Sequence, residues 1–127
     1  MDYSASWDSD APDGRNELLF GDYDQEGVIA VTIIWGYFRG ASGKGEIIEF
    51  DILFDTDFTW GDAIENPELM DLQNIATHEL GHGAGLADLY QTETSEETMH
   101  GYSTEGETKK RTLHDGDKTG IQLLYGE

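Results

Sequence analysis

The sequence predicts an α+β domain built from β-strands and two helices. Segments 27–38 and 46–54 are rich in β-branched and aromatic residues and predict two long strands, and a shorter strand is expected at 17–22. Apolar residues at helical spacing predict a helix from residue 67, and a second, short helix is expected within 113–126. Strands followed by helices are typical of an α+β fold.

Length and composition indicate one domain spanning residues 1–127 and exclude several classes of partner. The chain has no cysteine, so it has neither disulfides nor thiolate metal ligands. No apolar run approaches the roughly 20 residues of a membrane span, so no membrane partner is expected. The net charge of −20 repels phosphate backbones, which argues against nucleic acid as a partner.

The predicted first helix has recognisable start and stop signals. Asn66 is expected to cap it, because asparagine accepts hydrogen bonds from the first free N–H groups, and Pro67 suits the first helical position. The helix is expected to end between Gly83 and Gly85, where glycine supplies a left-handed turn.

The remaining segments are predicted as loops, apart from the closing helix. In that helix, Ile121 and Leu124 are expected to face inward and Gly126 to end it. The predicted loops are an irregular lead-in over 1–16, a turn-rich loop over 39–45, an acidic loop over 55–65 and a long loop over 90–111.

The segment HELGH, residues 78–82, carries the clearest chemical signal. His78 and His82 are four residues apart, so a helix places both imidazoles on one face, where both can reach one Zn²⁺. Glu79 points about 100° away around the helix and is expected to act as a general base on a zinc-activated water. The pattern therefore predicts metal-assisted hydrolysis, with a polar helix face as the alternative.

A catalytic zinc site needs a third protein ligand and an open fourth position. Asp88 follows His82 by six residues, and Gly85 permits the sharp turn that would bring it back to the metal. The pattern His-Glu-x-x-His-x-x-Gly-x-x-Asp thus indicates Asp88 as the third ligand. The alternative is a zinc enzyme of another kind with a distant ligand, Glu105 or Glu107.

This motif is one of four segments that occur in the same order as in a known family. HELGHGAGLAD resembles the zinc motif of the metzincin metalloproteases, and ETMHGY, GEIIEFDILF and GIQLLYG are similar to segments of their matrixin branch. The resemblance implies a zinc endopeptidase with a twisted mixed sheet, an antiparallel rim strand and a Met-turn. It also implies Met99 as the methionine beneath the metal, Tyr102 as a possible substrate or oxyanion contact, and an extended peptide substrate pairing with 27–37.

The sequence also departs from the matrixin pattern. Asp88 stands where a histidine is usual, no cysteine is available for a latency switch, and too few histidines remain for a second zinc. The N-terminal strand and backing helix of the family have no clear counterpart, which predicts a fragment or a minimal domain. The resemblance implies a secreted protein. A zinc-binding module with little or no activity remains the alternative function.

Calcium is a further possible cofactor, because carboxylates are its usual ligands. The alternative explanation for the many acidic residues is a highly solvated surface. The sequence does not indicate the oligomeric state. The acidic groups that could hold calcium are Asp8, Asp10 and Asp13 near the N-terminus, and Asp55, Asp57 and Asp62 in the acidic loop. His100 and His114 are expected to be exposed and without function.

Overall fold

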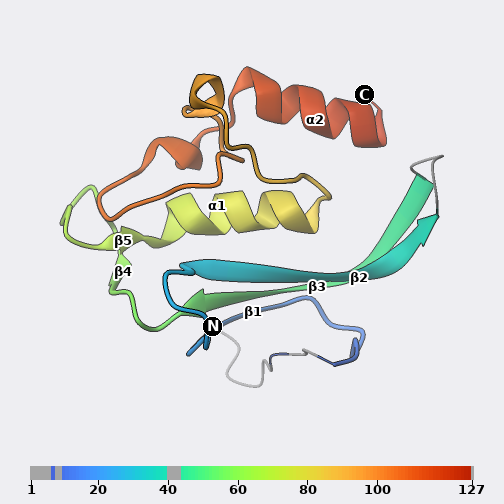
Figure 1. Cartoon of the computed structure of the whole chain (residues 1–127), viewed down its shortest axis with the longest axis horizontal. Coiled ribbons are helices and arrows are strands. Elements are labelled where there is room, and N and C mark those ends of the chain that lie inside the picture. The colour runs from blue at the N-terminus through green and yellow to red at the C-terminus, as the bar shows by residue number, and fades with distance from the viewer. Residues whose placement is uncertain (1–6, 8–9, 40–43, 127) are drawn as a thin grey trace. The chain divides into compact units, whose positions relative to one another are not determined.

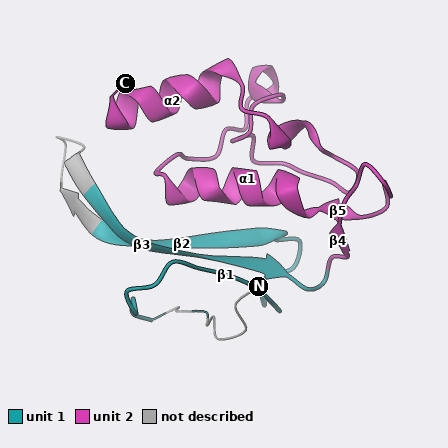
Figure 2. Cartoon of the chain, turned by 180° about the vertical axis from the view of Figure 1, so that it is seen from behind, with its two compact units in different colours: residues 1–57 teal, residues 58–127 magenta. Residues whose placement is uncertain are grey.

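The computed structural model describes residues 7, 10–39 and 44–126, so Asp8 and most of the predicted loop at 39–45 lie outside the described residues. The chain divides into two compact units, residues 1–57 and 58–127 (Figure 2). Within the described residues, no helix is long and apolar enough to cross a membrane.

Unit 1 is a three-stranded mixed sheet (Figure 1). Together with the two helices of unit 2, this sheet confirms the predicted α+β class. Its order is β1-β3-β2, with β1 parallel and β2 antiparallel to the central β3. The antiparallel strand therefore lies at one edge, as the resemblance implies. The strands are β1 (Glu17–Gly21), β2 (Ala30–Arg39) and β3 (Lys44–Asp55).

The central strand is shielded from solvent on both faces. Ile52, Leu53 and Phe54 are consecutive and all buried, although successive side chains of a strand point to opposite faces. Glu49 is also buried, and its carboxylate accepts hydrogen bonds from the backbone N–H groups of Asp13 (3.3 Å) and Gly14 (2.7 Å). The lead-in segment is thus fastened to the sheet by a carboxylate that would be costly to bury unpaired.

Unit 2 contains both helices and a small second sheet. The strands β4 (Trp60–Gly61) and β5 (Met70–Asp71) form a parallel pair, which the sequence analysis placed in a loop and a helix. The helices are α1 (Leu72–Gly83) and α2 (Asp115–Tyr125), and two 3₁₀ turns lie at Thr92–Thr94 and Lys109–Arg111.

The predicted start of the first helix at Asn66 and Pro67 is wrong. Asn66 does bind a following N–H group, that of Glu68 at 3.0 Å, but it forms a turn and not a helix cap. The cap is Asp71, whose Oδ2 accepts the N–H of Asn74 at 2.8 Å and whose carboxylate binds the Arg111 guanidinium. Contacts with the Ala63 N–H group and with Arg111, 40 residues away, favour this start.

The predicted C-terminal ends of the two helices agree with the structure better than the predicted start of the first helix does. The first helix ends at Gly83, and Gly85 adopts a φ of 102°, which confirms the expected glycine turn. The closing helix ends at Tyr125, and Gly126 follows as its C-cap, as predicted. Leu124, however, is 50% exposed, so the expectation that it faces inward is wrong, whereas Ile121 is partly buried beside an apolar pocket.

Candidate metal centre

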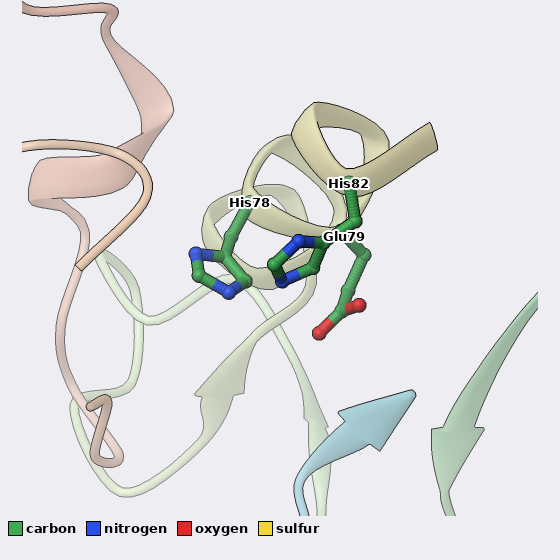
Figure 3. A group of neighbouring side chains, drawn as sticks. All are labelled: His78, Glu79 and His82. Atoms are coloured by element: carbon green, nitrogen blue, oxygen red, sulfur yellow. The ribbon is translucent and has the colours of Figure 1, made fainter. Parts of the chain in front are cut away.

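His78 and His82 project from the same face of α1, and their rings lie next to each other (Figure 3). The ring centroids of His78 and His82 lie 4.8 Å apart, and the ring planes are nearly perpendicular at 89°. His78 is buried and His82 partly buried. One turn of helix therefore presents two imidazoles to a common point, as expected from their spacing.

Asp88 returns to this point after the glycine turn. Its Oδ1 lies 2.9 Å from Nε2 of His78 and 3.1 Å from Nε2 of His82. Two ligand atoms at tetrahedral positions about 2.0–2.1 Å from zinc are about 3.3 Å apart. Both separations from Asp88 Oδ1 are thus close to that expected between two ligand atoms of one zinc ion.

The hydrogen bonds on the other ring nitrogens fix the position of one proton on each histidine. Nδ1 of His78 lies 2.7 Å from the carbonyl oxygen of Thr98, and Nδ1 of His82 lies 2.7 Å from that of Leu86. Because a carbonyl only accepts, each Nδ1 carries a proton, and Nε2 is the atom that a neutral ring offers to a metal. Two imidazole nitrogens and a carboxylate oxygen are ligands that zinc takes in proteins, so the donor set fits zinc.

Glu79 supplies a carboxylate beside the histidines without duplicating Asp88. It is 6% exposed, and one of its oxygens lies within 4.8 Å of the histidine ligand atoms. Its carboxylate extends next to the His82 ring (Figure 3). Asp88 Oδ1 contacts both Nε2 atoms and suits ligation, and the buried Glu79 carboxylate beside them suits proton transfer.

Met99, which the resemblance implies beneath the metal, packs against the ligand-bearing helix α1 at Gly81. It is 2% exposed, and Gly81 leaves room for its thioether, since a Cβ there would lie 2.2 Å from Sδ. Asp117 of α2 accepts hydrogen bonds from the backbone N–H groups of Thr98 (2.9 Å) and Met99 (3.2 Å). The closing helix therefore holds the segment whose Thr98 carbonyl binds His78.

Tyr90 contacts a candidate ligand and Tyr102 packs against Tyr90, and the sequence analysis named only Tyr102. Tyr102 is 64% exposed, and its ring packs edge-on against those of Tyr90 and His100, with centroids at 5.3 and 5.7 Å. Tyr90 donates its phenol to Oδ2 of Asp88 at 3.2 Å. The negative charge of Asp88 raises the pKa of Tyr90, so the phenol keeps this proton. No local pattern marks this contact, which is why the sequence analysis did not name Tyr90.

The remaining histidines are less exposed than expected. His100 is partly buried and pairs with the Thr94 hydroxyl at 3.3 Å, and His114 is partly buried at the start of α2.

The distant glutamates have other surroundings. Glu107 Oε1 accepts hydrogen bonds from Lys110, Asn74 and Ser103, and these donors, Lys110 foremost, hold its pKa below the ordinary value despite burial. Glu105 is exposed, and its nearest polar partner is the Thr104 hydroxyl at 3.4 Å. Glu107 is thus engaged in a buried ion pair, which disfavours it as a zinc ligand.

The acidic residues considered for calcium separate into different surroundings. Asp55 and Asp57 lie together with Asp22, which the sequence analysis did not single out, and the charge of Asp55 raises the pKa of Asp57. Asp62 instead pairs with Arg111 at 3.0 Å. Asp13 binds the N–H of Arg15 at 2.9 Å. The calcium ligands therefore stay a prediction.

The fold and the donor set together define a class of protein. A mixed sheet followed by a helix with two histidines, a glycine turn and a buried methionine turn is the metzincin arrangement. Within that class the chain belongs to the matrixin family, because the sequence model described as Matrixin matches residues 18–126. No curated protein matches the chain.

Proposed function

We propose that this matrixin domain is a zinc-dependent endopeptidase that hydrolyses peptide bonds. The observation that supports this most directly is the contact of Asp88 Oδ1 with both histidine Nε2 atoms, beside the buried carboxylate of Glu79. Matrixins generally bind zinc and are generally secreted, and we extend both properties to this chain.

In the proposed site, His78, His82 and Asp88 would hold the metal. Zinc would supply Lewis acidity, which polarises a carbonyl and makes a water more acidic. The carbonyls of Thr98 and Leu86 keep both rings in the required tautomer.

Glu79 is the proposed proton carrier. Its carboxylate accepts a proton from the attacking water and then delivers it to the leaving amine nitrogen, as general base and then general acid. Burial at 6% exposure limits competition from bulk solvent. Met99 packs against Gly81 and supports the helix turn on which Glu79 and His82 stand.

An extended peptide or protein is the proposed substrate. Strand β2 lies at the edge of the unit 1 sheet, and a peptide can add to such an edge as a further strand. The exposed ring of Tyr102 offers a substrate contact in unit 2.

Zinc analysis and cleavage of denatured casein by the full chain and its Glu79→Gln variant test the proposal. We expect one zinc per chain in both proteins, and a loss of activity in the variant of about 10²- to 10⁴-fold, the usual contribution of a general base. Glu93→Gln is a matched control, because Glu93 is exposed on a 3₁₀ turn.

The wild-type result and one further variant, Asp88→Ala, separate the alternatives. One zinc per wild-type chain without cleavage of any denatured protein would support a binding module with little activity. Full zinc retention by Asp88→Ala would support a distant glutamate ligand and refute the role of Asp88.

A further inference from the structure

The two carboxylate oxygens of Asp88 have different surroundings. Oδ1 faces the Nε2 atoms of His78 and His82 at 2.9 and 3.1 Å, whereas Oδ2 accepts the 3.2 Å hydrogen bond from the Tyr90 phenol. A carboxylate can bind a metal ion through one oxygen or through both. An imidazole has one lone pair to offer, so this choice exists here because the third candidate ligand is an aspartate.

The position of Tyr90 is set by the backbone on both sides of the site. The N–H of Leu89 donates to the Met99 carbonyl at 2.8 Å, and the N–H of Gly101 donates to the Leu89 carbonyl at 2.7 Å. The chain after Asp88 is thereby paired with the chain after Met99. The Tyr90 ring, although 56% exposed, lies against Gly101, where a Cβ would be 2.3 Å from its Cε1 atom.

We propose that Tyr90 is a positioning residue that keeps Asp88 bound to the metal through Oδ1 alone. A catalytic zinc site uses three protein ligands and keeps one position open, and a second oxygen from Asp88 would crowd that position. A hydrogen bond from the phenol to Oδ2 holds this oxygen away from the metal. The role rests on the zinc site proposed above.

The visible absorption spectrum of the full chain loaded with Co²⁺ tests this role, because the absorption of cobalt weakens as its coordination number rises above four. We expect Tyr90→Phe to lose absorption intensity, since Oδ2 becomes free to bind. Tyr102→Phe is the matched control and should keep the wild-type spectrum: its ring packs against Tyr90, but Tyr90 supplies the hydroxyl that contacts Asp88.

A second variant separates the loss of the hydrogen bond from any effect that removal of the hydroxyl has on folding. Gly101→Ala keeps the phenol but displaces the Tyr90 ring by steric overlap, so it should lose absorption intensity as Tyr90→Phe does. Cobalt uptake with wild-type spectra in both variants would overturn the role of Tyr90 and leave the metal site intact. Failure of the wild-type chain to take up cobalt would overturn the metal site, and the role of Tyr90 with it.

Discussion

Gly81 lies between Glu79 and His82 on α1, where a larger residue would collide with Met99. A Cβ would lie 2.2 Å from Sδ and 3.1 Å from Cε of a side chain that is 2% exposed. Alanine would favour the helix by roughly 0.5–1 kcal/mol over glycine, but forced repacking in a core costs roughly 1–3 kcal/mol. The steric term is therefore the larger of the two.

We expect Gly81→Ala to lower the free energy of unfolding by about 1 kcal/mol, measured by urea denaturation of the metal-free protein. In a Met99→Ala background the collision is gone, so the same change should stabilise by about 0.5–1 kcal/mol. A stabilising effect in the wild-type background would contradict this account, because it would show that Met99 moves aside freely.

At the scale of elements, Asp117 connects α2 to the segment that binds His78. Its carboxylate accepts backbone hydrogen bonds from His114, Thr98 and Met99. Burial alone would raise the pKa of Asp117, but these N–H donors hold it below the ordinary value. The folded state therefore favours the charged form, and its contribution to stability is present above about pH 3.9 and is lost as the pH falls through the folded pKa.

Asp117→Asn should lower the free energy of unfolding at pH 7 by about 2–3 kcal/mol, since hydrogen bonds to a charged group are involved. Its stability should also change less than that of the wild type between about pH 5 and pH 2, as urea denaturation at each pH would measure. Asp115→Asn, an exposed acid on the first turn of the same helix, should behave like the wild type. Equal losses in the two variants would refute the special role of Asp117.

The elements show which features local sequence could predict. The four-residue spacing of His78 and His82 and the glycine turn depend only on helix geometry, so their arrangement was predictable. The start of α1 was not, because Asn66 and Asp71 are both good caps, and Asp71 is favoured by contacts with Ala63 and the distant Arg111. The contact of Tyr90 with Asp88 depends on backbone pairing with the Met99 segment, which no local pattern reveals.

At the scale of the whole molecule, the net charge of −20 opposes folding through repulsion among like charges. Several acids are nevertheless buried and engaged with hydrogen-bond donors, as Glu49, Asp71 and Asp117 are. These interactions are screened little by salt, whereas those among exposed acids are screened strongly. The exposed acids should therefore determine how stability responds to ionic strength.

We expect sodium chloride to raise the thermal unfolding midpoint by at least ~4 °C, equivalent to about 1 kcal/mol, as the screening length falls from about 30 Å at 0.01 M to about 3 Å at 1 M. Replacing three exposed acids, Asp10→Asn, Glu65→Gln and Glu93→Gln, should reduce this rise because less repulsion remains to be screened. Calorimetry of both proteins over the salt series measures the difference. If salt lowered the midpoint, attractive ion pairs such as that of Arg111 with Asp62 would dominate over repulsion. If the rise were equal in both proteins, a general effect of chloride on apolar burial would replace screening as its cause.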